Sequence, residues 1–376
     1  MLQAPGKNKL ADRILEIGGY AAGYAGRLFA HAGADVVRVQ GQNPPAWASP
    51  QAMQIYLHAD KRQVTIADAN ILKSLAEAAD VVICHLETAD EVMQLGIQEW
   101  RCPVKVVLTP FGLTGPKRNW QATPSTLLAM GGYTAVIGDA DKAPLSLPGH
   151  YVEFQAGALA YTAASAALFT GKGLAGKGLA AKGQNTQEAN QENTEVVDIS
   201  LFETIMSCSQ FSTTLWHCAG EMRSRHGSDF WFVEPSELYP CADGWVYVNI
   251  VPQFWDPFCV FLGLPELSVD ERFSDNDKRR ANRVALHAIV AKQLKDQTKA
   301  ELDQKVAECR VPVGVVKTLQ EVLDDSHLRE RQHFYHVAHS EQAVKVPGTS
   351  FRINQQAHPD RNHMTSVDSV EWQNHG

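Results

Sequence analysis

Residues 13–39, RILEIGGYAAGYAGRLFAHAGADVVRV, decide the fold class. Short apolar strands are predicted at residues 13–17 and 35–39, and a helix is predicted between them at residues 27–32. A strand, a helix and a second strand in this order make a βαβ unit, in which the two strands run parallel. The sequence therefore predicts an α/β fold.

The glycine-rich segment at residues 18–26 is predicted to be the turn that joins the first strand to this helix. Its glycines do not follow the GxGxxG spacing, and Gln40 stands where a dinucleotide-binding fold places an acid, so NAD binding is disfavoured. Two interpretations stay open. Backbone N–H groups at the helix start bind an anionic or carbonyl group, or the glycines only let the strand and the helix pack closely.

The alternation of strand and helix continues to residue 109. Further strands are predicted at residues 64–66, 81–83 and 104–109, with a helix at residues 70–79. Apolar runs of this kind are typical of strands that are buried on both faces of a parallel sheet. We expect an open, mostly parallel sheet whose ligands bind at the carboxyl ends of its strands.

The composition disfavours several classes of protein. The chain has 376 residues, of which 44% are hydrophobic, enough for one large or two ordinary domains. A net charge of −8 argues against a broad nucleic-acid surface. The seven cysteines form no CxxC pair and lack the Cys/His spacing of a structural zinc site, so we expect no metal. No apolar run reaches the length of a membrane span and no signal-peptide pattern is present, which predicts a cytoplasmic protein.

The second half of the chain predicts a smaller domain inserted into the first. Residues 171–195 repeat GKGLA and then become rich in Gln, Asn and Glu, which indicates a mobile surface insertion. A linker helix is predicted over about 200–222, where the first part of the large domain, 1–222, ends. A hairpin turning at Asp243-Gly244 and several helices predict a small α+β domain over 223–312, and residues 313–376 are predicted to return to the large domain.

Several short stretches are not specific alone, but their order and spacing along the chain are specific. They include RILEI at 13–17, GADVVRV at 33–39, Lys61-Arg62, ADVV at 79–82, FGLTGP at 111–116, AMGG at 129–132, VDISLFE at 197–203, ADGWV at 242–246, LGLPEL at 262–267 and VPV at 311–313. Together they resemble the family III CoA-transferases, also called the CaiB/BaiF family. The resemblance implies a Rossmann-like large domain, a small domain inserted by long linkers, and two subunits interlocked as a homodimer.

The resemblance also implies the ligands and where they bind. Acyl-CoA and a carboxylic acid are the implied substrates, no cofactor is permanently bound, and CoA lies in a cleft between the domains. Its adenosine phosphates are placed near Arg38, Lys61 and Arg62, which suit phosphate because Arg binds it bidentately and Lys supplies a point charge. The implied contacts with the rest of CoA are Ala22, Gly23 and Gly112, and those of the acyl pocket are Tyr20, Tyr24, Phe111, Gly131 and Gly132.

The family places its catalytic carboxylate four residues before a glycine that opens an Ala-rich helix. The stretch YVEFQAG at 151–157 has that layout, so Glu153 falls where the family has Asp. The resemblance implies that this carboxylate attacks the acyl-CoA to give an anhydride, and that CoA then returns to form an enzyme thioester. The alternative role for Glu153 is a carboxylate that stabilises the helix N-terminus.

Two kinds of group are candidates to assist this carboxylate. Backbone donors for an oxyanion are expected at Gly18, Gly19 and Gly23 or at Gly131 and Gly132, and the alternative is plain turn geometry. His150 is close in sequence to Glu153, but a lone His on a loop is more often solvated or capping than a base.

Other activities stay open on the same scaffold. The racemase branch of the family adds a His about thirty residues upstream of the carboxylate, and the stretch NWQATPS at 119–125 has none, which disfavours racemisation. A different acyl-CoA enzyme, such as a racemase, hydrolase or lyase, is the second hypothesis. The third is a CoA-binding protein without catalysis.

Overall fold

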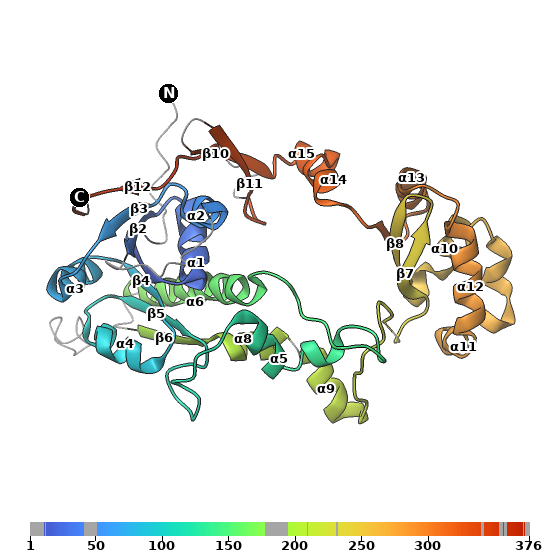
Figure 1. Cartoon of the computed structure of the whole chain (residues 1–376), viewed down its shortest axis with the longest axis horizontal. Coiled ribbons are helices and arrows are strands. Elements are labelled where there is room, and N and C mark those ends of the chain that lie inside the picture. Colours follow the sequence, from blue (N-terminus) through green and yellow to red (C-terminus); the bar gives the residue numbers. More distant parts are fainter. Residues whose placement is uncertain are drawn as a thin grey trace. The chain divides into compact units, whose positions relative to one another are not determined.

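A computed structural model describes most of the chain and divides it into two compact units (Figure 1). The described residues are 11, 13–40, 51–176, 195–208, 210–230, 232–339, 342–352, 356, 359–370 and 372. The larger unit comprises Met1–Tyr133, Ser146–Glu221 and His327–Gly376, and the smaller comprises Thr134–Leu145 and Met222–Ser326. Each unit is described by itself below.

The larger unit contains a seven-stranded parallel sheet, which confirms the predicted fold class. The strands follow the order β12-β3-β2-β1-β4-β5-β6. Their bounds are β1 (Arg13–Gly18), β2 (Asp35–Gln40), β3 (Arg62–Thr65), β4 (Val81–His85), β5 (Val104–Thr109), β6 (Glu195–Ser200) and β12 (Thr365–Ser366). Successive strand residues point to opposite faces, so Ile14 and Leu15 of β1 enter two different apolar cores.

Helices cover both faces of the sheet, as apolar residues on both faces require. One core packs the sheet against α1 (Tyr20–His31), α5 (Pro124–Met130), α6 (Tyr151–Gly176) and α8 (Leu201–Cys208). The opposite core packs it against α3 (Ala69–Glu77) and α4 (Ala89–Leu95). The helix predicted over about 200–222 is present as α8 and α9 (Gln210–Ala219). Helix α6 continues to Gly176, so the first residues of the predicted insertion are helical, and residues 177–194 lie outside the described part.

The predicted start of the first helix is wrong, because α1 begins at Tyr20 and not at Arg27. Low helix propensity made residues 18–26 resemble a turn, but tertiary packing needs small residues there. A Cβ atom built on Gly26 would lie 2.1 Å from Oε2 of Glu16, a side chain buried in the middle of β1. The glycines of this segment therefore allow a helix to lie directly over a buried carboxylate.

The C-terminal part of the chain packs on α1 and on α2 (Gln51–His58) through an antiparallel hairpin of β10 (Phe334–His339) and β11 (Gln342–Pro347). The buried guanidinium of Arg27 holds it. This side chain donates to the hydroxyl of Tyr335 at 2.7 Å, to the carbonyl of Pro347 at 2.6 Å and to the carbonyl of Tyr56 at 2.5 Å. One α1 residue thus ties together segments that are far apart in sequence.

The smaller unit has a three-stranded antiparallel sheet, β7 (Ser236–Cys241), β8 (Gly244–Asn249) and β9 (Val313–Val315). The predicted hairpin at residues 243–244 is present, since Cys241 pairs with Gly244. Its helices are α10 (Trp255–Phe261), α11 (Asn276–Ala281), α12 (Arg283–Leu294), α13 (Lys299–Cys309) and α14 (Leu319–Leu323). Because β9 pairs with β8, the chain stays in this unit through Ser326 and does not leave it at the predicted residue 313.

Candidate active site

The strand order reverses between β1 and β4, and ligands of open α/β sheets bind at such a point, outside the carboxyl ends of the strands. At this edge α1 begins directly after β1, close to His85 at the end of β4. The N–H of Gly19 donates to the carbonyl of His85 at 3.1 Å, and the N–H of Ala21 donates to its Nδ1 at 3.3 Å. A Cβ on Gly19 would lie 2.6 Å from that Nδ1, so the close approach requires glycine.

Helix α6 begins at the same edge, because it runs parallel to α1. Three ring contacts follow the two helices in step: Tyr20 with His150 at 4.6 Å, Tyr24 with Phe154 at 4.8 Å, and Phe29 with Tyr161 at 4.7 Å between ring centroids. Gly157 allows the helices this close, since a Cβ there would lie 2.6 Å from the carbonyl oxygen of Ala21. Two helix N-termini, each favouring negative charge, therefore lie side by side.

Glu153 is the third residue of α6 and lies in this region. The residue is 7% exposed. Its Oε1 is 3.3 Å from Nδ1 of His150, the residue that precedes the helix, and its buried Oε2 has no hydrogen-bond partner among the described residues. A capping carboxylate would accept a backbone N–H at the helix start. Here one oxygen contacts an imidazole and the other contacts no donor among the described residues, so Glu153 caps no backbone N–H. Its place in the first turn of α6 leaves the alternative role, a carboxylate that stabilises the helix N-terminus, open.

His85, the last residue of β4, and Glu87, two residues further on, belong to this region, although the sequence analysis missed them. Burial lowers the pKa of His85 to about 4, and its Nδ1 accepts an N–H, so the ring is neutral with its proton on Nε2. Burial first, then the charges of Glu91 and Glu153, raises the pKa of Glu87. The signal that could have identified them is their position at, and just beyond, the carboxyl end of a buried strand.

Four of the five expected backbone donors are engaged inside the chain. The N–H of Gly19 bonds His85, that of Gly23 bonds the carbonyl of Gly19 at 3.1 Å, and that of Gly131 bonds the carbonyl of Leu127 at 2.8 Å. The N–H of Gly132 donates to the carbonyl of Ala129 at 3.3 Å. Of the two interpretations, turn and helix geometry therefore accounts for these four glycines.

The three cations predicted to bind phosphates all pair with carboxylates. Lys61 is fully buried, and its Nζ lies 2.5 Å from Oε2 of Glu16 and 2.8 Å from the carbonyl of Gly23. In this conformation the enclosed ammonium is the counter-ion of Glu16, and phosphate binding by Lys61 stays a prediction. Arg38 is 16% exposed and lies 2.8 Å from Oε1 of Glu16, and Arg62 is 27% exposed and pairs bidentately with Asp35. Phosphate binding by these two arginines stays a prediction.

The other predicted contact residues lie in three different settings. Tyr20 and Tyr24 lie beside Glu153 through the ring contacts of α1 with α6. Ala22 and Phe111 are buried in the core, where the Phe111 ring packs on Phe202 at 5.7 Å. Gly112 has a φ of +81° and forms a turn that Asp198 holds by accepting the N–H of Leu113 at 3.0 Å. The predicted contacts of these residues with CoA stay predictions.

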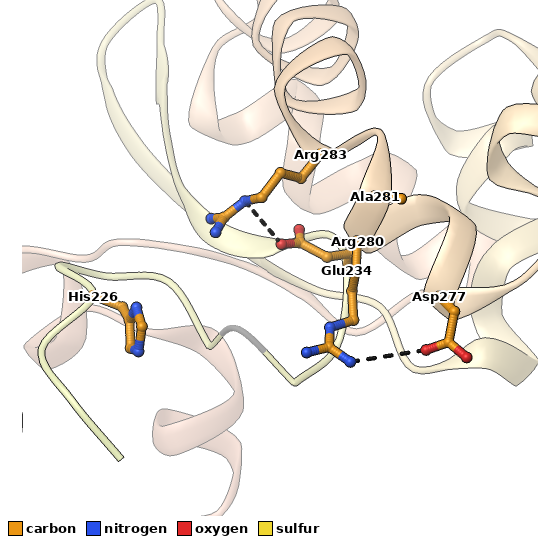
Figure 2. Close-up of a pocket in the computed structure, with 6 residues that line it drawn as sticks. All are labelled: His226, Glu234, Asp277, Arg280, Ala281 and Arg283. Atoms are coloured by element: carbon orange, nitrogen blue, oxygen red, sulfur yellow. Dashed lines mark ion pairs between the residues drawn. The ribbon is translucent and has the colours of Figure 1, made fainter. Parts of the chain in front are cut away.

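The smaller unit has a hollow of about 540 Å³ (Figure 2). It is lined by His226, Glu234, Asp277, Arg280, Ala281 and Arg283. Its charges pair with one another: Arg283 Nε is 3.3 Å from Glu234 and Arg280 is 3.8 Å from Asp277. None of the predicted site residues lines it, so we place the candidate active site at the sheet edge of the larger unit.

No described helix combines the length and apolar character that crossing a membrane requires. No group of three or more His, Cys, Asp or Glu side chains in the described ranges is arranged to hold a metal ion.

Comparisons with known proteins agree on the family. The model of "CoA-transferase family III" matches residues 12–363. The chain is 26% identical to succinyl-CoA–D-citramalate CoA-transferase of Chloroflexus aurantiacus, covering 85% of this chain and 81% of the relative. It is 24% identical to succinate–glutarate CoA-transferase of Agrobacterium fabrum, covering 85% and 82%. Among solved structures, a CaiB/BaiF family protein from Brucella suis superposes with a TM-score of 0.73 at 21% identity, over 96% of this chain and 95% of that one.

Proposed function

The chain belongs to CoA-transferase family III, and from that premise we propose that Glu153 is the nucleophile that moves CoA from an acyl-CoA to a carboxylic acid. One observation carries the proposal. Glu153 is buried beside two helix N-termini and has one carboxylate oxygen without a partner among the described residues. An unpartnered buried oxygen raises the free energy of the resting site, which a reaction at that oxygen relieves.

The proposed transfer of CoA needs only the acyl-CoA, the acceptor acid and Glu153. Oε2 attacks the acyl carbon of the donor, the C–S bond breaks, and CoA leaves as a thiolate. The thiolate attacks Cδ of Glu153, the bond from Cδ to Oε2 breaks, and the donor acid leaves with that oxygen. The acceptor carboxylate then attacks Cδ and displaces CoA, which finally takes the acceptor acyl group and restores the carboxylate. The N-termini of α1 and α6 stabilise the thiolate and the oxyanions.

The surroundings of Glu153 inform the substrate class. Tyr20, Tyr24 and Phe154 provide aromatic surface beside it, and Glu87 adds a carboxyl group whose raised pKa favours the neutral form. We propose an acyl pocket that favours larger or less polar acyl groups than formyl or oxalyl. CoA as the substrate, an interlocked homodimer and a cytoplasmic location stay predictions from the family resemblance.

Trapping the intermediate tests the nucleophile. We expect that incubation with succinyl-CoA, acetyl-CoA or benzoyl-CoA followed by hydroxylamine converts Glu153 to a hydroxamate, which mass spectrometry of the peptide detects. Glu203, also the third residue of a helix but exposed, is the matched control: Glu203→Gln should trap normally and Glu153→Gln should not. Transfer without any modification of Glu153, or unchanged transfer by Glu153→Gln, would refute the assignment.

A further inference from the structure

The two oxygens of Glu153 have different surroundings, and this difference has a chemical consequence. Oε2 has no partner among the described residues, whereas Oε1 lies 3.3 Å from Nδ1 of His150. In the reaction proposed above, Oε2 forms and breaks bonds. Oε1 stays on Cδ throughout and takes up negative charge each time a nucleophile adds to Cδ.

We propose that His150 is a catalytic residue whose Nδ1–H stabilises the oxyanion that forms on Oε1 when CoA or the acceptor acid adds to Cδ. The inference rests on the proposed function. The electron pair of the Cδ–Oε1 π bond moves onto Oε1 during addition and returns when the leaving group departs. A donor already on that oxygen needs no reorganisation at the moment of reaction. The 3.3 Å separation is of the length that commonly tightens when a substrate binds.

The backbone and neighbours of His150 keep its ring in place. Its carbonyl accepts the N–H of Phe154 at 3.0 Å, which fixes the residue at the start of α6. Its ring meets Tyr20 edge to face at 4.6 Å with an interplanar angle of 89°. The ring is therefore held by packing on α1 while its Nδ1 faces Glu153, so position and proton donation are separable by substitution.

Four of the five glycine N–H groups considered for this task are already bonded. Those of Gly19, Gly23, Gly131 and Gly132 each bond a carbonyl within the chain. Among the described residues that contact Glu153 by a hydrogen bond, His150 supplies the donor. The assignment thus gives the site the oxyanion donor that these glycines do not provide.

Two variants separate the donor from the ring. His150→Phe keeps an aromatic ring against Tyr20 and removes the N–H, whereas His150→Asn removes the ring and keeps an N–H near the place of Nδ1. We expect His150→Phe to slow formation of the enzyme–CoA thioester about 100-fold with little change in the KM for acyl-CoA, as loss of one oxyanion donor does. His150→Asn should stay within about 10-fold of the wild type, and His217→Ala, an exposed site, is the control.

A spectroscopic readout excludes a purely structural role. With 13C-glutamate in the chain, the infrared band of the thioester carbonyl should lie at lower wavenumber in the wild type and in His150→Asn than in His150→Phe, because a hydrogen bond weakens the C=O bond. Equal wavenumbers, or wild-type rates of thioester formation in His150→Phe, would overturn the role of His150 while the adduct on Glu153 preserves the proposed function. Absence of that adduct in the wild type would overturn both.

Discussion

Helix α1 lies between two buried glutamates whose surroundings differ. On one side, Glu16 of β1 has no exposed surface, and each of its oxygens has a cation, Arg38 at 2.8 Å and Lys61 at 2.5 Å. On the other side, Glu153 of α6 has one oxygen 3.3 Å from His150 and one with no partner in the described structure. Both carboxylates are buried, but only Glu16 is saturated with donors.

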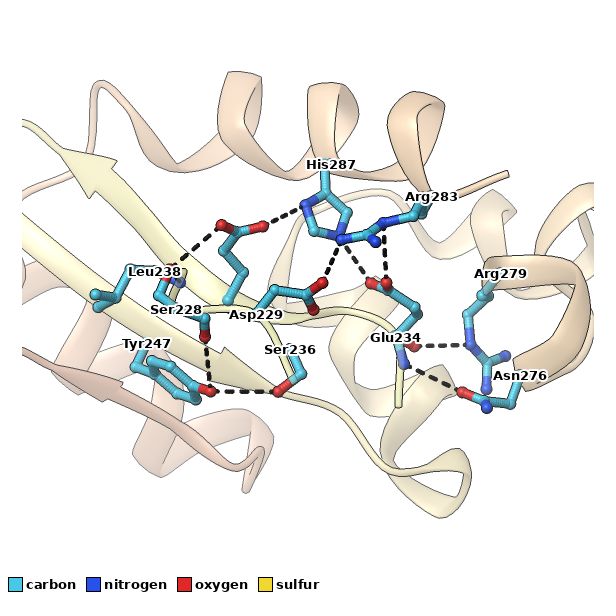
Figure 3. A network of polar contacts seen from close by, with 11 residues as sticks. Ser228, Asp229, Glu234, Ser236, Leu238, Tyr247, Asn276, Arg279, Arg283 and His287 are labelled. Atoms are coloured by element: carbon cyan, nitrogen blue, oxygen red, sulfur yellow. Dashed lines mark hydrogen bonds and ion pairs between the residues drawn. The ribbon is translucent and has the colours of Figure 1, made fainter. Parts of the chain in front are cut away.

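The difference teaches how a structural acid can be told from a reactive one in this chain. A buried charge is tolerated when it is paired and hydrogen-bonded, and a carboxylate whose two oxygens both contact cations is a weak nucleophile. Glu234 in the smaller unit repeats the saturated case, because Arg283 contacts Oε1 at 3.3 Å and His287 contacts Oε2 at 2.7 Å (Figure 3). Glu153 is therefore the exception among these three acids.

The largest expected effect comes from neutralising each acid in turn. Glu16→Gln leaves Lys61 buried without its counter-ion and should lower the free energy of unfolding by about 3–5 kcal/mol. Glu234→Gln should also destabilise, because it leaves Arg283 and His287 with fewer acceptors. Glu153→Gln removes a carboxylate that has one oxygen without a partner in the described structure. It should change the free energy of unfolding by about 1 kcal/mol or less, while abolishing transfer. Urea unfolding curves measure all three, and a large loss of stability in Glu153→Gln would erase the distinction.

Adding one methyl group on each side of α1 should give the next largest effect. A Cβ on Gly26 would lie 2.1 Å from Oε2 of Glu16, and a Cβ on Gly157 would lie 2.6 Å from the carbonyl of Ala21. We expect Gly26→Ala and Gly157→Ala each to cost about 1–3 kcal/mol. Gly157 sets how closely α6, the helix that carries Glu153, packs on α1. For the same loss of stability, Gly157→Ala should therefore lose more transfer activity than Gly26→Ala.

Thermal unfolding and transfer rates of the two variants, with Gly314→Ala as a control that meets no neighbouring atom, check this expectation. Equal losses of activity in the variants of Gly26 and Gly157 would show that the Glu16 side also shapes the reaction.

Much of the fold was predictable because buried parallel strands leave apolar runs that are visible in sequence. The strands at residues 13–17, 35–39 and 104–109 were found for this reason. The start of α1 was missed because local propensity disfavours glycine in helices. Only the structure reveals that Glu16 lies beneath the glycines of α1. An acid inside the apolar strand RILEI was nevertheless a sign that a buried cation would be needed.

The candidate site was predictable in part. Glu153 was identified through the family resemblance, but its contact with His150 depends on α6 starting at Tyr151, which sequence patterns define only to within a few residues. The pairing of Lys61 with Glu16 was not predicted, because a lysine beside an arginine looks the same in sequence whether it is solvated or enclosed. The partners of a charged side chain are set by tertiary packing, so roles that depend on them were the least predictable.

The smallest expected effect concerns the histidines beside the two saturated glutamates. Burial, then the charges of Lys61 and Arg38, lowers the pKa of His58 well below its usual value. The pKa of His287 is raised: burial acts to lower it, but the hydrogen bond and charge of Glu234 and the charge of Glu237 together outweigh burial and nearby Arg283. Stability linked to His58 is therefore lost as pH falls below about 6.5, whereas stability linked to His287 is present there and is lost as pH rises through its raised pKa.

Denaturation midpoints between pH 5 and 8 should thus respond to acid less steeply in His58→Gln and more steeply in His287→Gln than in the wild type. A change of the same sign in both variants would contradict the opposite pKa shifts of the two histidines.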